Sequence, residues 1–245
     1  MNLLKLFTAV LIFAPAVQAG DPAPQKILEQ SDRARGGLAG GLSWTIHIKA
    51  VQDGAPTESE YEVKAKGNDV LAKCTQPARQ KGEVFLFNNR NLWIHRPGLK
   101  KPVSISTRQR LTGQAANGDI ATTNYARDYT AKLEGTETVG GLPSYKLMLK
   151  AKTKDVTYDG IRYWVSKDKL LAMRAEFLTL DGKVFKKAGF EYDNSVTSGG
   201  KSQPFVSRMT IIDAAFASNT TTIEYKQPMP ADLKASVFNV NNISR

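Results

Sequence analysis

The sequence is poor in the side chains that most often carry chemistry, with one cysteine and two histidines among 245 residues. The single Cys74 excludes an internal disulfide, and its surroundings indicate a small buried apolar residue rather than a reactive thiol. His47 and His95 lie in separate segments, and no HExxH, CxxC or calcium-loop spacing is present. Because a metal site needs clustered ligands, we predict no metal and no other cofactor.

The motifs of common enzyme classes are also absent. No GxSxG stretch marks a serine hydrolase. The glycines within positions 36–41 follow a helical pattern instead of joining a strand to a helix, which argues against a nucleotide-binding loop. We therefore assign no catalytic residue. Carboxylates scattered over many segments leave open a hydrolase that uses a carboxylate pair, and this is the minor alternative.

One run of apolar residues stands out, at the N-terminus. Residues 1–19 combine a positive start, an apolar run over 6–14 and a small-residue cleavage pattern ending at Ala19, which predicts a signal peptide cleaved after Ala19. We expect export to the periplasm of a Gram-negative bacterium. No later run is long enough to cross a membrane. The formal net charge of +11 then favours either solubility alone or contact with an anionic membrane surface, and not nucleic acid.

Alternation of apolar and polar residues predicts a mainly β protein with one domain over 20–245. Residues 24–38 predict an opening helix, and the polar stretch 107–126 has room for one or two short helices around a Gly118-Asp119 break. Elsewhere we expect about eleven strands, drawn from the segments 42–50, 58–67, 70–75, 83–96 (a hairpin), 102–106, 129–139, 144–152, 160–166, 170–180, 183–193, 204–212 and 220–226. Short strands linked by turns favour an antiparallel barrel or sandwich.

Two of these segments carry apolar residues on both faces. The run Val-Phe-Leu-Phe at 84–87 is one example, and the segment 170–180 is the other. A sheet with one solvated face alternates, so both faces of these strands must be covered. Either the early helix and a second layer fill the two faces, or a concave sheet lines a ligand cavity. The composition leaves both interpretations open.

The second half of the 83–96 hairpin and the turn after it bring a histidine, a tryptophan and two lysines close together in the sequence, as in an active site. Trp93 and His95 share one face of the strand, so we interpret His95 as a packing neighbour of Trp93. His47 lies on the polar face of its own strand, where a solvated or hydrogen-bonded role is expected. Lys100 and Lys101 follow a Pro-Gly turn, and such a turn is either simply solvated or a contact for a lipid headgroup or a partner.

Five segments occur in an order and spacing that resemble a known family. They read ILEQSDRARGG, WTIHI, KGEVFLFNNRNLWIHRPGLKKPVSIS, GDIATTNYARDYTAKLEGTETVGGLPSYKLMLKAK and YWVSKDKLLAMRAEFLTLDGKVFKK. Together they resemble the LolA-like outer-membrane lipoprotein-sorting proteins, most closely an uncharacterised periplasmic branch. The resemblance covers residues 25–240, and its most specific parts lie at 81–97, 119–137 and 164–183. Each motif is short, and their common order carries the match.

The resemblance implies an incomplete, strongly curved antiparallel β-barrel of about eleven strands with an α-helical lid. The apolar space between barrel and lid would take the acyl chains of a lipid or lipoprotein. This implies a carrier or chaperone for transfer toward the outer membrane, and not an enzyme. An inner-membrane exporter of the resistance-nodulation type is a candidate partner. A non-enzymatic adaptor of an envelope or exporter complex, with a filled core, is the alternative.

Alternating apolar faces supply the candidate acyl-lining residues within such a fold. They are Trp44, Ile46, Ile48, Phe85, Phe87, Trp93, Leu147, Leu149, Tyr163, Met173, Phe177 and Met209. The candidate contacts to a headgroup or a membrane are basic side chains of the 96–110 stretch, namely Arg96, Lys100, Lys101, Arg108 and Arg110. The sequence does not say which face of the sheet is concave.

Overall fold

The computed structural model describes residues 20–244 except 37–39, 89 and 122–123, so the predicted signal peptide lies outside the described residues. The described helices are α1 (Pro24–Arg33), α2 (Asn117–Ala121) and α3 (Tyr125–Asp128), with the 3-10 turns η1 (Ala78–Gln80), η2 (Ala235–Phe238) and η3 (Val240–Asn242). None of these helices is long and apolar enough to cross a membrane. Strands make up most of the remaining regular structure, as the alternation predicts.

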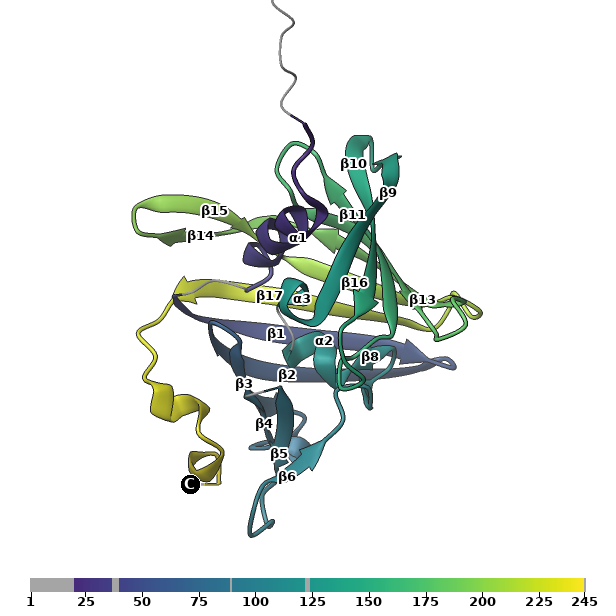
Figure 1. Ribbon diagram of the computed structural model, residues 1–245. Coiled ribbons are helices and arrows are strands. Elements are labelled where there is room, and N and C mark those ends of the chain that lie inside the picture. The colour runs from purple at the N-terminus through teal and green to yellow at the C-terminus, as the bar shows by residue number, and fades with distance from the viewer. Residues whose placement is uncertain (1–19, 37–39, 89, 122–123, 245) are drawn as a thin grey trace, which may run out of the picture.

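Thirteen strands form one antiparallel sheet that curves strongly and does not close (Figure 1). From edge to edge they are β6 (Val103–Ile105), β5 (Asn91–His95), β4 (Val84–Asn88), β3 (Asp69–Gln76), β2 (Ala55–Lys66), β1 (Gly41–Gln52), β17 (Thr220–Pro230), β16 (Arg208–Asp213), β13 (Val184–Glu191), β12 (Ala172–Leu178), β11 (Gly160–Ser166), β10 (Leu142–Ala151) and β9 (Tyr129–Val139). Most strands that are neighbours in the sheet are also consecutive in the sequence. Pairing of β1 with β17 joins the first and last strands in the middle of the sheet.

The described strands exceed the eleven that the sequence predicts. Two further hairpins stand apart from the main sheet, β7 (Arg110–Thr112) with β8 (Ala115–Ala116) and β14 (Asn194–Ser198) with β15 (Lys201–Phe205). The single strand predicted at 204–212 is the end of β15 and the whole of β16, because the chain bends between them. These strands escape the sequence pattern because they are short, and mostly polar in the second hairpin, which gives too little alternation.

Alternation separates the buried face from the solvated face correctly in the long central strands. In β1, Trp44, Ile46 and Ile48 are buried, whereas His47 lies on the opposite face. Trp44 pairs with Val63 and Ile46 with Tyr61 of β2, so the apolar faces of neighbouring strands line up. This register produces one continuous apolar surface on the concave side of the sheet.

The three helices lie over the concave side (Figure 1). Helix α1 packs against β9, β11 and α3, and α2 packs against β3 and β4. The described part of α1 ends at Arg33, shorter than the predicted 24–38. Gly36, with φ of 108°, then takes a backbone conformation that favours glycine. The predicted break at Gly118-Asp119 lies inside α2 rather than between two helices.

A second layer covers the convex side of the edge hairpin. Val84 and Leu86 of β4 pack against Leu233, Phe238 and Ile243 of the C-terminal segment. This contact explains why the 84–87 run is apolar on both faces. The expectation that both faces of this hairpin are covered is confirmed, and the covering segment comes from the far end of the chain.

Candidate functional site

The concave face carries one large apolar cluster that extends over the sheet and helices. Ten of the twelve predicted acyl-lining residues belong to it, namely Trp44, Ile46, Ile48, Phe85, Phe87, Leu147, Leu149, Tyr163, Phe177 and Met209. All eight tyrosines of the chain lie in this cluster or pack against it. The inner wall is therefore aliphatic and aromatic, and it contains many phenol groups.

Trp93 and Met173 lie outside the inner cluster, unlike the other predicted lining residues. Trp93 packs against the outer cluster beneath the C-terminal segment, because Leu92 and Ile94 take the inward positions of β5. Met173 is displaced by an irregularity in the pairing of β11 with β12, where Trp164 faces Arg174 and Val165 faces Ala172. The extra residue shifts the alternation, which simple counting along 170–180 does not anticipate.

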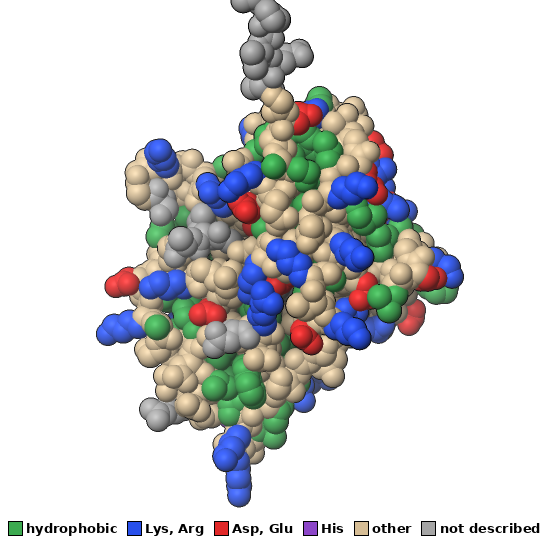
Figure 2. Space-filling view, viewed as in Figure 1, with side chains coloured by type: hydrophobic (Ala, Val, Ile, Leu, Met, Phe, Trp, Pro, Cys, Tyr) green, Lys and Arg blue, Asp and Glu red, His purple; other side chains and the backbone are tan. Residues whose placement is uncertain are grey.

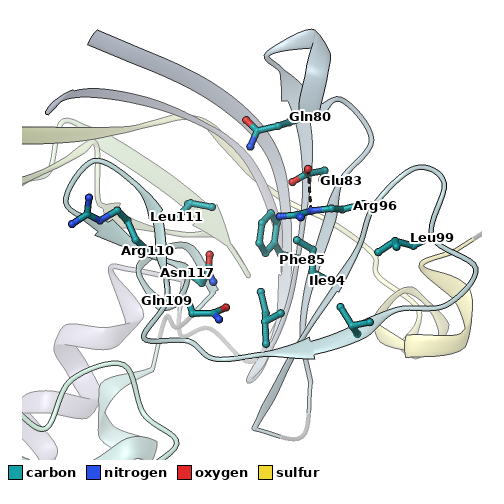
Figure 3. A pocket seen from close by; sticks show the side chains of 12 residues that line it. Gln80, Glu83, Phe85, Ile94, Arg96, Leu99, Gln109, Arg110, Leu111 and Asn117 are labelled. Atoms are coloured by element: carbon teal, nitrogen blue, oxygen red, sulfur yellow. Dashed lines mark ion pairs between the residues drawn. The ribbon is translucent and has the colours of Figure 1, made fainter. Parts of the chain in front are cut away.

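A pocket of about 340 Å³ opens near the β6 edge of the sheet (Figure 3). Phe85 and Ile94 reach it from the inner cluster, and Arg96 and Arg110 contribute charge at its border. Nε of Arg96 lies 3.2 Å from Oε1 of Glu83. Apolar wall and basic side chains thus meet here, the combination that binding of an amphiphile requires.

The other predicted headgroup contacts are spread over separate surfaces. Lys100 and Lys101 are exposed in the turn between β5 and β6. Arg108 donates two hydrogen bonds of 2.9 and 2.7 Å to Asp159, and this contact lowers the pKa of the Asp159 carboxyl. Arg108 borders a different pocket of about 580 Å³, shared with the exposed Leu180 and Phe185. The five basic residues therefore do not form one site, and Lys and Arg side chains are spread widely over the face shown in Figure 2.

Charged residues inside the helix-sheet interface are the feature that the sequence reasoning missed. Asp32 and Arg35 on and just after α1 are 2% and 4% exposed. Burial raises the pKa of Asp32 to about 7, although a hydrogen bond from the Ala126 N–H and the charge of Arg35 oppose the rise. Asp32 lies four residues after Leu28, and Arg35 lies eight residues after Ile27. On a helix this spacing puts both charged residues on the same face as the buried Ile27 and Leu28, so the sequence contained the signal.

A second buried polar group lies beneath α2. The hydroxyl of Tyr158 donates to Asp119, with distances of 2.9 and 2.8 Å to its two carboxylate oxygens. Nζ of Lys186 donates to the carbonyl oxygen of Gln114 at 2.6 Å. Burial raises the pKa of Asp119 and lowers that of Lys186. These bonds tie the 114–119 segment to β13 and the loop before β11.

The histidines and the cysteine lie as the sequence indicates. His47 is on the outer face, with ring nitrogens 3.2 Å from Glu58 and 3.7 Å from Glu224. His95 lies on the same face of β5 as Trp93 and contacts the carbonyl oxygen of Leu99 at 3.1 Å. Cys74 is buried and unpaired. Across the described ranges, no three His, Cys, Asp or Glu side chains come together as metal ligands.

Comparisons with known proteins agree with this architecture. A family model described as "Uncharacterized protein" matches residues 66–245, and no curated protein matches the chain. A LolA superfamily protein of Nitrosomonas europaea is 30% identical, with 89% of this chain and 98% of that chain covered and a TM-score of 0.79.

Two more distant crystal structures share the fold. The first is a putative outer membrane lipoprotein-sorting protein domain from Vibrio parahaemolyticus, at 18% identity and a TM-score of 0.77, covering 91% of this chain and 98% of that one. The second is a DUF1329 family protein from Desulfovibrio piger, at 19% identity and a TM-score of 0.74, covering 90% and 97%. An incomplete, curved antiparallel sheet with helices on its concave side, together with the match to the Nitrosomonas protein over nearly the whole chain, makes this protein a member of the LolA superfamily.

Proposed function

We propose that this protein is a periplasmic carrier that binds the acyl chains of a lipid or lipoprotein and delivers them toward the outer membrane without catalysis. The observation that carries the proposal is the continuous apolar face on the concave side of the sheet, covered by short helices. The likeness to a lipoprotein-sorting domain supports it. The predicted signal peptide supports export to the periplasm of a Gram-negative bacterium.

Cargo would lie between the sheet and α1, along the ten inner residues named above. Helices α1, α2 and α3 act as a lid in this proposal. A long acyl chain gains on the order of 10 kcal/mol when about a dozen methylenes leave water. Helix α1 buries Ile27 and Leu28 in the inner cluster, worth about 1.5–3 kcal/mol each. The gain from cargo therefore exceeds the loss from displacing these two side chains.

Lipid that copurifies with the protein is the direct test of this function. We expect solvent extracts of the purified protein to contain acyl lipid, and the lipid-free protein to take up a fluorescent fatty acid. Mass spectrometry of the extract and a fluorescence titration measure the two. A clean extract together with no uptake contradicts the proposal.

The basic turn before β6 is expected to assist at the membrane surface. Replacing both Lys100 and Lys101 with serine removes two exposed charges, each worth about 1 kcal/mol at an anionic surface, so binding to anionic vesicles falls by up to about thirtyfold. Cosedimentation with vesicles at low salt measures this. Serine at Lys169, exposed in a turn, and at Lys201, exposed at the start of β15, is the matched control. An equal loss in both double variants would show that only net charge matters.

An adaptor of an envelope or exporter complex is the second candidate, and the interior packing favours it. The ten inner wall residues are each at most 5% exposed, so the interface between helices and sheet is filled in this state. Such an adaptor would hold a protein partner, for example an inner-membrane exporter of the resistance-nodulation type. Crosslinking in cells separates the two functions, because an adaptor gives a persistent protein adduct and no bound lipid.

A further inference from the structure

A guanidinium group is enclosed within the inner cluster. Arg35 follows α1 and is 4% exposed. Its Cζ lies 4.5 Å from the centroid of the Tyr125 ring and 5.1 Å from that of Phe190. The carbonyl oxygen of the preceding Ala34 accepts a 2.8 Å hydrogen bond from the N–H of Val206, which fixes this part of the chain against the β15–β16 junction.

Among the described residues, Arg35 uses little of its capacity to donate hydrogen bonds. A guanidinium carries five N–H donors and stays protonated in proteins. Its one hydrogen bond to a side chain in the described structure is a long one, 3.4 Å from Nη1 to the Tyr163 hydroxyl. No carboxylate oxygen of the described residues lies within 4.0 Å of its nitrogens. Buried charges are normally paired directly with an opposite charge. The buried carboxyls of Asp32 and Asp119 interact with Arg35 electrostatically, but among the described residues neither makes a direct ion pair with it.

Tyrosine side chains of the sheet lie near the Arg35 guanidinium. Tyr163 shares its hydroxyl between Arg35 and Ser31, at 3.4 and 3.5 Å. The hydroxyl of Tyr192 is buried and has no hydrogen-bond partner within 3.5 Å in the described part of the chain, and the nearby backbone of Ala172 moderates the rise in its pKa. Tyr192 and Tyr225 both interact electrostatically with Arg35. Phenols are protonated at neutral pH, and burial raises the pKa of these three further, so their hydroxyls can donate hydrogen bonds.

We infer that Arg35 and its tyrosine neighbours form an internal binding site for the anionic end of a single-chain amphiphile, a carboxylate or a monoester phosphate on a long alkyl chain. The inference rests on the proposed function, because the alkyl chain lies along the apolar inner wall. Planar guanidinium donors match the oxygens of either anion. Phenol hydroxyls complete the shell, and the aromatic rings exclude water from it.

This site defines the class of cargo more narrowly than an apolar wall does. An entirely hydrocarbon interior binds any acyl chain and does not discriminate between headgroups. A buried cation selects against neutral lipids, because they leave its donors unpaired. The cargo is therefore an anionic amphiphile whose charged end enters the protein, rather than a neutral acylated lipid whose head stays outside.

Binding of matched ligands to the purified, lipid-free protein tests the inference. The ligands are a long-chain fatty acid, the monoalkyl phosphate of equal chain length and the corresponding alcohol, each measured by displacement of a fluorescent fatty acid. We expect at least one anion to bind ten or more times more tightly than the alcohol. The anion that binds more tightly identifies the headgroup.

Variants at Arg35 assign the selectivity to this residue. Arg35→Met is expected to lower the affinity for the preferred anion at least tenfold and to leave the alcohol unchanged, and Arg35→Lys should restore part of the loss. Arg33→Met on the exposed face of α1 is the matched control and should change neither. Equal binding of acid and alcohol in the parent and in Arg35→Met overturns the inference and leaves the carrier function standing. Binding of no ligand overturns both.

Discussion

Replacing Asp32 with asparagine is expected to raise the midpoint of thermal unfolding by about 8–16 °C at pH 8 and to leave it nearly unchanged at pH 4. The carboxyl is 2% exposed, and its Oδ2 accepts a 2.7 Å hydrogen bond from the N–H of Ala126. Loss of water raises its pKa from 3.8 to about 7 in the folded protein. Asparagine keeps an oxygen for the Ala126 N–H and never acquires the buried charge.

The number of protons bound by the folded and unfolded states determines how stability changes with pH. Between about pH 4 and pH 7 the folded protein holds a proton that the unfolded chain has released, so stability falls as the pH rises through this window. At 1.36 kcal/mol per unit of pKa, the whole shift is on the order of 4 kcal/mol. This contribution to stability is fully present below the unfolded pKa and is absent above the folded one.

Thermal scans of the parent and Asp32→Asn from pH 4 to pH 8 measure the effect. Glu29→Gln on the solvent side of α1, where the carboxylate pairs with Lys26 at 2.9 Å, is the control and should follow the parent at every pH. A variant less stable than the parent at pH 8 would mean that the Asp32 carboxylate is stabilised, and not destabilised, by its surroundings.

Replacing Phe238 with alanine is expected to lower the free energy of unfolding by about 3–5 kcal/mol. The ring is 3% exposed and packs between the C-terminal segment and the convex face of the edge hairpin. Its loss leaves a cavity beside Val84 and Leu86, and the backbone of a sheet cannot collapse to fill it. We also expect Trp93, which packs against the same cluster, to become accessible to a fluorescence quencher.

Urea unfolding measures the change in stability, and Phe216→Ala is the matched control. Phe216 is 65% exposed, so the same substitution there should change the free energy of unfolding by no more than about 0.5 kcal/mol. If both variants unfold alike, the C-terminal segment does not contribute to the stability of the sheet. Binding of cargo should survive Phe238→Ala at low denaturant, because the inner cluster is on the other face.

Local alternation was sufficient to predict the long strands and their faces. In β1 the period of two places Trp44 inward and His47 outward, and both positions are confirmed. Side chains in a strand point to opposite faces by backbone geometry alone, so one buried residue fixes its neighbours. The same rule fails at Met173, where an irregular pairing adds a residue that no pattern in a single strand reveals.

The family and the general architecture also followed from the sequence, through the order of its motifs. The charged interior did not. Asp32 and Arg35 look like solvated residues in a polar helix, and they become buried because α1 lies across β9 and β11 with α3 at its side. A helix has a buried face only with respect to what it packs against, so its sequence pattern alone is ambiguous when polar residues occupy that face.

By itself, then, the sequence determined an antiparallel β fold with an apolar, aromatic face, because strand alternation is a local property. The order of its motifs added the incomplete barrel of the LolA type through the family resemblance. The tertiary structure decided three other features. It placed the C-terminal segment on the convex face, collected all eight tyrosines on the concave one, and enclosed Arg35 among them. Each depends on contact between residues far apart in the chain, and such contacts are set by the packing of whole elements rather than by any run of neighbouring residues.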